Sequence, residues 1–179
     1  MKEPDAPGPN TRASDLTLLR ITPADAGCVR LFFQELSGDP ETCSFFHPHP
    51  FTPLQADKIS NYTGMDYYAA VIRGDRMIGY GMLRGWDEGY EIPTLGIVVS
   101  SSSRGLGLGR LIMEYLHVIA RARNVRSIML KVYKKNEAAV RLYRGLGYVL
   151  SDHDQEWKGV LEIGAERRGA PECGRAGCK

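Results

Sequence analysis

The stretch Ser100–Arg110, SSSSRGLGLGR, places glycine at every second position between two arginines, directly after an apolar run and before an amphipathic one. Glycine loses the most backbone entropy on folding, so its repeated use indicates a backbone that turns sharply or approaches another group closely. A glycine turn between a strand and a helix points backbone N–H groups at one spot, and the positive end of the helix dipole reinforces them. The pattern predicts a phosphate-binding loop, with a flexible connection that binds nothing as the alternative.

Two well-known phosphate loops do not fit this spacing. A P-loop requires Gly-Lys-Ser/Thr at its end, and Arg110 with Leu111 stands where the Lys-Ser/Thr pair would be. The dinucleotide pattern G-x-G-x-x-G requires glycine at position 110 or 112, which Arg110 and Ile112 occupy. What remains is a strand, a turn with glycines at 105, 107 and 109, and a helix that starts at the last of them. A pyrophosphate fits such a turn.

The hydrophobic periodicity predicts one domain over residues 16–163. Alternating or continuous apolar runs predict strands at 16–22, 67–73, 76–85, 92–100, 127–133, 148–155 and 157–163, the fourth of them buried on both faces. Helical spacing predicts helices at 23–36, 53–61, from Gly109 onward and from Asn136 to Gly145 or Gly147, with a loop before Pro53. The order is that of an α/β or α+β fold without internal repeats. Residues 1–15 and 164–179 are predicted to be disordered tails.

Composition excludes several classes of protein. No apolar run approaches the roughly 20 residues of a membrane span. The N-terminal segment lacks the hydrophobic centre of a secretory signal, so a cytoplasmic location without membrane contact is expected. The four cysteines show no zinc-ribbon spacing, and no metal site is predicted, with a metal role for Cys173 and Cys178 as a minor alternative.

The charges separate along the chain. Residues 104–144 contain ten basic and two acidic side chains, whereas residues 35–91 contain nine acidic and four basic ones. The first segment favours an anion and the second a cation, unless both are ordinary mixed surface. Because no basic motif is interleaved with aromatic residues, a nucleic-acid partner is not predicted.

Three segments together resemble the GNAT superfamily of acetyltransferases. The family's loop R/Q-x-x-G-x-G/A is matched by Arg104, Gly107 and Gly109, with Gly105 as a common addition. A second family pattern is matched downstream, at Asn136, Ala139, Tyr143, Gly147 and Tyr148. The run IPTLGIVVS stands where the family's fourth strand lies. The resemblance implies a mixed, mostly antiparallel sheet of six to seven strands, splayed at the fourth strand and flanked by about four helices.

The resemblance also implies acetyl-CoA as cosubstrate. The cofactor-binding residues would be those of the loop, namely Arg104, Gly105, Leu106, Gly107, Leu108, Gly109 and Arg110, together with Asn136. The backbone of Ile97, Val98 and Val99 would hold the pantetheine arm, although their side chains can equally be plain core. Tyr143 would contact the cofactor and act as general acid, because a phenol is mostly protonated at neutral pH. For Tyr143 the alternative is a half-buried helix aromatic.

The acceptor side is less determined. Glu88 and Glu91 precede the fourth strand, where some family members carry a basic carboxylate, but water is an alternative base. Phe46, His47 and His49 in FFHPHPF lie where the acceptor binds, and this segment is interpreted first as a rigid aromatic wall, second as a base and last as a metal pair. The acidic segment suggests a cationic acceptor.

The expected function is N-acetylation of a primary amine of a small molecule, with an amino sugar as one option. An inactive acyl-CoA-binding module and a protein N-acetyltransferase are the alternatives. The spacing does not choose between a monomer and a homodimer.

Overall fold

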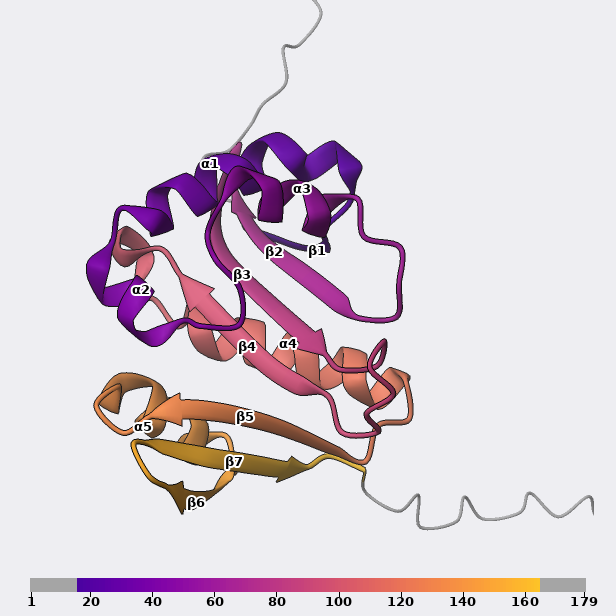
Figure 1. Cartoon of the computed structure of the whole chain (residues 1–179), viewed down its shortest axis with the longest axis vertical. Helices are drawn as coiled ribbons and strands as arrows, with labels where there is room; N and C mark the ends of the chain where they lie inside the picture. The colour runs from indigo at the N-terminus through magenta and orange to yellow at the C-terminus, as the bar shows by residue number, and fades with distance from the viewer. Residues whose placement is uncertain (1–15, 165–179) are drawn as a thin grey trace, which may run out of the picture.

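The structure is a computed structural model that describes residues 16–164. One sheet of seven strands has the order β1-β2-β3-β4-β5-β7-β6 (Figure 1). Its strands are β1 Leu16–Arg20, β2 Tyr67–Arg73, β3 Arg76–Arg84, β4 Thr94–Val99, β5 Ser127–Tyr133, β6 Val149–His153 and β7 Glu156–Glu162. The helices are α1 Ala26–Ser37, α2 Pro40–Phe45, α3 Pro53–Ser60, α4 Leu108–Ala122 and α5 Glu137–Gly145, with 3-10 turns at Pro23–Asp25 and Ser101–Ser103. The predicted α/β fold is confirmed.

Helix α2 lies where a loop was expected. Pro40 stands at its first position, and the Asp39 side chain caps it by accepting hydrogen bonds from the backbone N–H groups of Glu41 and Thr42. Both are ordinary start signals of a helix, but the helix is only six residues long and has too few turns to show a periodic pattern. The two predicted tails, and with them Cys173 and Cys178, lie outside the described residues, apart from Gly164.

The sheet is split between β4 and β5. All other neighbouring strands pair antiparallel over most of their length, but the parallel pair β4–β5 is in register only at Thr94 and Met129. A hydrogen bond of 3.0 Å from the Met129 N–H to the carbonyl of Pro93 is part of this junction. Beyond it the two strands diverge, as Figure 1 shows, so the splay expected at the fourth strand is confirmed.

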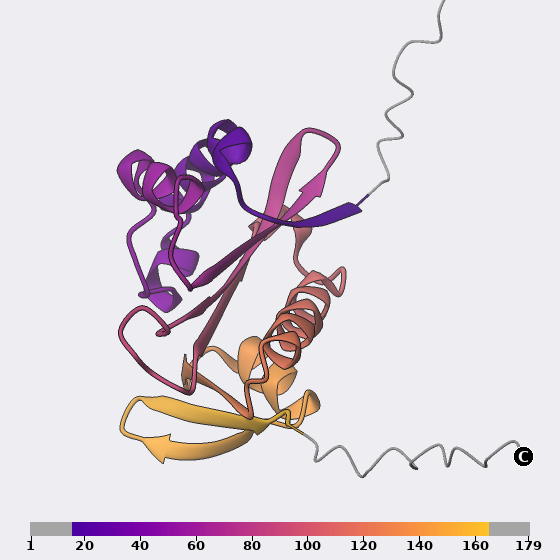
Figure 2. The ribbon, with the colours of Figure 1, turned by 90° about the vertical axis from the view of Figure 1, so that its right-hand side faces the viewer.

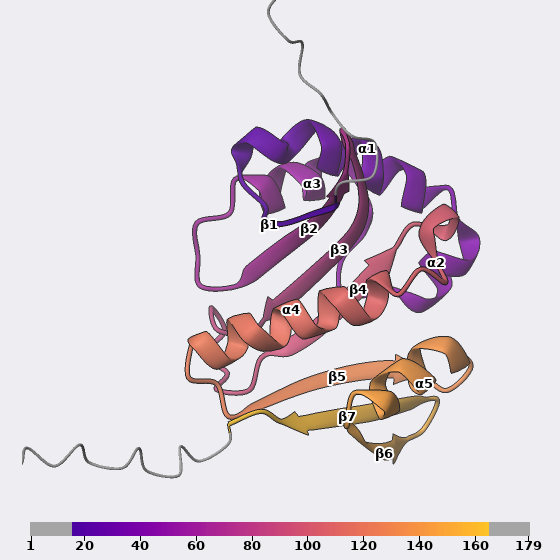
Figure 3. The same ribbon diagram turned by 180° about the vertical axis from the view of Figure 1, so that it is seen from behind.

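The two halves of the sheet are covered differently. Helices α1 and α3 pack on one face of β1–β4, called the front face here, and α4 packs on the back (Figure 2). Gly81 permits the close approach of α4, because a Cβ there would lie 2.5 Å from Ile112. Seen from behind, α5 covers β5 and β7 (Figure 3), while no described helix covers the front of β5, β7 and β6.

Among residues 16–164, no helix has both the length and the apolar character needed to span a membrane.

Candidate active site

A cleft of about 960 Å³ occupies the split between β4 and β5. All of β4 borders it, which corrects the expectation of a strand buried on both faces: only Leu95 and Val98 are buried, and the others are half-exposed because they face the cleft. The glycine loop and the start of α4 form one end. Tyr143 and Asn136 approach from α5, and α2 with the segment after it forms the front wall.

The backbone of β4 turns alternate residues toward the cleft. Pro93 directs its carbonyl to β5, whereas the N–H of Ser100 donates to Ile78 of β3 at 3.0 Å. Since N–H and C=O groups alternate sides along a strand, Ile97 and Val99 face the cleft with their backbone groups. Val98, two residues before Ser100, directs its N–H and C=O to β3, where it lies opposite Tyr80. Of the three predicted pantetheine contacts, Ile97 and Val99 therefore have N–H and C=O groups on the cleft side, where no described strand pairs with them.

The alternating glycines have separate physical reasons. Gly105 and Gly107 adopt left-handed φ angles of +77° and +80°, and a Cβ on either would meet nothing within 4 Å. Gly109 is helical, and a Cβ there would lie 3.2 Å from Leu142 of α5. Helix α4 begins at Leu108, one residue before the predicted start, with Gly107 as an N-cap that has no capping side chain. The first N–H groups of α4 thus remain available to an anion beside open space.

Both arginines of the loop line the cleft and have protein partners. Arg104 donates to Glu41 Oε2 and Thr42 Oγ1, each at 2.6 Å, and lies 3.3 Å from Asp39 Oδ2. Arg110 donates to Glu114 at 3.1 Å and to the carbonyl of Gly145 at 3.3 Å. Leu106, the remaining predicted loop residue, is exposed and lies outside the cleft lining. The backbone, rather than an uncommitted guanidinium, is the ready anion site here.

Tyr143 lies at the base of the cleft. Its side chain is 7% exposed, and burial raises its pKa to about 12, so the phenol is protonated at neutral pH. Behind it, 5.9 Å away between ring centroids, lies Tyr148, whose hydroxyl is 2.9 Å from Nε2 of the buried His117. Asn136 caps α5 by accepting from the Ala139 N–H at 3.2 Å and also lines the cleft. The predicted acid and cap are thus brought together with the loop.

The predicted acceptor residues separate into two groups. Phe46, His47 and Glu88 line the cleft, with Glu88 3.8 Å from the Arg84 guanidinium. Glu91 and His49 do not line it. His49 lies 3.0 Å from the Tyr80 hydroxyl and stacks on Phe33, and burial lowers its pKa. This position of His49 fits the aromatic-wall interpretation.

Sequence reasoning missed a contact across the front of the cleft. Phe45 and His47 approach the ring of Tyr133 on β5, at 6.3 and 5.3 Å between centroids. It also missed Arg84, Lys131 and Glu156, which line the cleft. For Lys131 the sequence contains a signal, because this lysine stands between the apolar Leu130 and Val132 in a predicted strand.

Ion pairs neutralise much of the acidic segment, and Arg104 joins it to the basic segment. Carboxylates of the acidic segment pair with cations: Glu35 with Arg76, Asp57 with Arg30, Asp66 with Arg84, and Asp39 and Glu41 with Arg104. Of the expected carboxylates near the acceptor, only Glu88 lines the cleft. Within residues 16–164, no three His, Cys, Asp or Glu side chains gather as a metal site would require.

Known proteins are similar to this chain in sequence. Residues 30–148 match the family model described as acetyltransferase (GNAT) family. The chain is 34% identical over 74 residues (40% of this chain, 41% of the relative) to the N-terminal acetyltransferase B complex catalytic subunit naa20 of Schizosaccharomyces pombe. It spans about two fifths of the length of the curated relatives it matches, 38% and 41%.

Solved structures share the fold at low identity. A GNAT-family acetyltransferase from Streptococcus pneumoniae superposes with a TM-score of 0.70 at 20% identity, over 84% of this chain and 100% of the other. Arabidopsis thaliana NAA60 in complex with acetyl-CoA gives a TM-score of 0.61 at 14% identity, over 83% and 99%.

Proposed function

Because the chain belongs to the acetyltransferase (GNAT) family, we propose that it is an acetyl-CoA-dependent N-acetyltransferase acting on the primary amine of a small molecule, amino sugars included. The observation that carries the proposal is the convergence on one cleft of an uncapped helix start, an unpaired strand backbone and a buried, protonated tyrosine.

The residues present fit the donor. The N–H groups at the start of α4 would bind its pyrophosphate, because Gly105 and Gly107 leave open space where side chains would otherwise project. The free backbone groups of Ile97 and Val99 would hydrogen-bond the pantetheine arm, in place of the strand that the split removes. We do not assign Val98 to this role, since its backbone pairs with β3.

The reaction needs a C–N bond to form and a C–S bond to break. The amine attacks the thioester carbonyl, and a β4 backbone N–H stabilises the charge that develops on its oxygen. Tyr143 gives its proton to the departing thiolate. Before it attacks, the ammonium form of the acceptor loses its proton to water in the cleft, and the charge of Glu88 attracts that form to the site. Glu91 has no such place, because it lies outside the cleft lining.

A protein N-terminus is the second candidate acceptor, on the strength of the similarity to naa20 over 74 residues. The contact of Phe45 and His47 with Tyr133 crosses the front of the cleft and favours a small molecule over a continuous peptide.

The test is release of free thiol from acetyl-CoA with a panel of small amines, in wild type and in Tyr143→Phe. We expect turnover to fall by roughly 10²–10⁴ in this variant, the range for a positioned acid, while acetyl-CoA still raises the melting temperature. Tyr115→Phe is the matched control, because Tyr115 bonds to the Tyr67 hydroxyl outside the cleft. A wild-type protein that binds acetyl-CoA and acetylates no amine would instead be the inactive binding module.

A further inference from the structure

Two lysines face each other on the open front of the sheet. Lys131 of β5 and Lys158 of β7 are direct cross-strand partners. Ile128, Leu130 and Val132 point into the back core, so the intervening residue Lys131 points to the front, as does its partner. Within residues 16–164 neither lysine forms an ion pair. Like charges in this position destabilise a sheet, and no described carboxylate is within ion-pair distance of either lysine.

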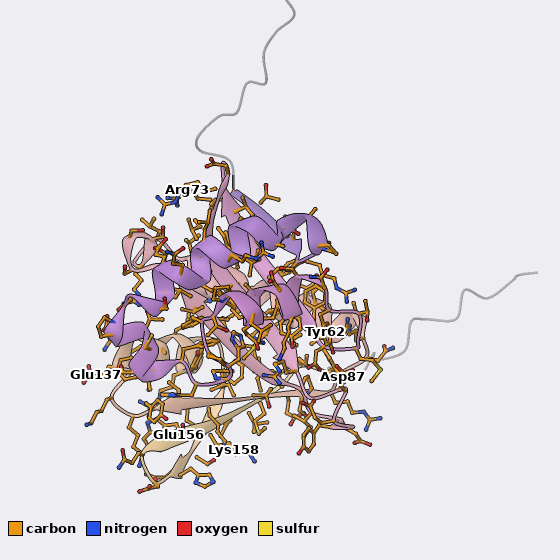
Figure 4. All side chains as sticks on the ribbon, turned by 45° about the horizontal axis from the view of Figure 1, so that its top comes forward. Tyr62, Arg73, Asp87, Glu137, Glu156 and Lys158 are labelled. Carbon is orange, nitrogen blue, oxygen red and sulfur yellow. The ribbon has the colours of Figure 1, made fainter. Side chains whose placement is uncertain are left out.

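A carboxylate without a cationic partner lies beside them. Glu156 is two residues from Lys158 on β7, and both are labelled on that strand in Figure 4. Glu156 and Lys131 line the cleft, although they are not within ion-pair distance of each other or of another charged group among the described residues. By contrast, Arg84 and Glu88, on the opposite side of the cleft, are paired with each other. Among the described charged residues that line the cleft, the two without an ion pair, Lys131 and Glu156, are thus both on the β5–β7 side.

We propose that the acceptor carries an anionic group, a carboxylate or a phosphate, in addition to its primary amine. Lys131 and Lys158 bind the anionic group on the front of the sheet, and the amine enters the cleft, where Glu156 and Glu88 attract its ammonium form. This inference rests on the proposed function and differs from the expectation of a cationic acceptor by adding an anionic group. A lysine pair without a counter-ion becomes favourable once an anion lies between the two ammonium groups.

The first test compares acceptors that differ in the anionic group alone. Glycine, 4-aminobutyrate and 6-aminohexanoate are each compared with the alkylamine of equal carbon number, and phosphoethanolamine with ethanolamine. We expect at least one amine with an anionic group to exceed its match without that group about tenfold in kcat/KM, the effect of a charge-assisted hydrogen bond. The carboxylate and phosphate arms identify the group.

Lysine variants then locate the effect. In Lys131→Gln and in Lys158→Gln, the ratio of kcat/KM between the amine with the anionic group and its match without it should fall close to one. The control variant Lys58→Gln, at an exposed lysine on α3, should keep the wild-type ratio. Lys131→Gln and Lys158→Gln should each keep or slightly raise the melting temperature, because either variant removes the like-charge pair. A ratio that does not depend on either lysine overturns the proposal. So does a loss of acetyl-CoA affinity with unchanged acceptor preference, which would assign the lysines to the donor.

A binding measurement separates this inference from the proposed function. Calorimetry with CoA-saturated protein compares 6-acetamidohexanoate with 6-acetamidohexanamide, which lacks the negative charge. Binding that requires both the carboxylate and Lys158 supports the anion site even if no amine is acetylated, an outcome in which only the proposed function fails. Equal binding of the acid and the amide overturns the anion site, even if amines are acetylated.

Discussion

The two sides of the cleft differ in how they are covered and in what their charges do. On the β1–β4 side, helices pack on both faces, and the carboxylates of Asp39, Glu41, Asp66 and Glu88 pair with arginines. On the β5–β7–β6 side, one face is open, and Lys131, Lys158 and Glu156 have no charged partner among the described residues. Under the proposed function, the first side would hold the donor in a fixed frame and the second side would meet the anionic group of the acceptor.

Carboxylates of the first side hold the ends of β3 and β4 in place. Glu35 bridges the Ser100 hydroxyl and Arg76, which fastens the end of β4 to α1. Asp66, buried, accepts from the N–H groups of Gly85 and Trp86 at 2.9 and 3.1 Å and shapes the turn after β3. A run of acidic residues in a sequence can therefore serve local structure rather than attraction of a cation.

The largest expected effect is the loss of acetyl-CoA binding when Gly107 is replaced. Gly107→Val places a branched side chain in the open space above the loop, so the rise in melting temperature with acetyl-CoA should disappear, a loss of about 3 kcal/mol at a hundredfold excess over Kd. Gly74→Val is the matched control, since its φ of +62° gives similar strain in a hairpin far from the cleft. Thermal melts of both variants check this, and a shift that persists in Gly107→Val would contradict the loop assignment.

The second largest expected effect is a pH dependence of stability, which comes from a buried contact between the two sides. His117 of α4 bonds to Tyr148, which follows α5, and burial lowers the His117 pKa to about 4. Below pH 6.5 His117 binds a proton in the unfolded chain, whereas in the folded chain it stays neutral down to about pH 4. The free energy of unfolding therefore falls by at most about 3 kcal/mol between pH 6.5 and 4, and it levels off at lower pH.

The variant His117→Gln keeps a hydrogen-bond acceptor for Tyr148 and does not titrate. Urea denaturation from pH 7 to 4 should show a flatter profile for it than for wild type, although His49 and the carboxylates leave some slope in both. His153→Gln, an exposed histidine on β6, should retain the wild-type profile. Parallel profiles for His117→Gln and wild type would remove His117 as the source.

The smallest expected effect separates two glutamates that the sequence treats alike. Glu88→Gln should raise the KM for the amine about two- to fivefold, as expected from loss of one exposed charge, and added salt should shrink the difference. Glu91→Gln should leave KM unchanged, because Glu91 lies outside the cleft lining. Steady-state kinetics at two salt concentrations checks both, and equal effects of the two variants would argue against a cleft role for Glu88.

The fold was predictable because its signals are local. Glycine alternation, the Asn136 cap and the apolar periods of β4 and α4 each act within about a turn or strand of sequence. The missed parts depend on residues that are distant in the sequence. Arg104 donates hydrogen bonds to Glu41 and Thr42, more than 60 positions away, and the ring of Tyr133 contacts His47 across the cleft. His47 and His49 illustrate the limit, since one proline separates a cleft residue from a wall residue and nothing in their composition distinguishes them.

The split gives this sheet four edges where an unbroken sheet of seven strands has two. Besides the outer strands β1 and β6, the inner strands β4 and β5 each end with backbone groups that no strand pairs. Unpaired strand edges invite pairing with other chains, and proteins commonly shield them. Here the two inner edges face each other, and the contact of Phe45 and His47 with Tyr133 lies across their front. A strand of a second molecule would have to displace this contact to reach the two inner edges from the front.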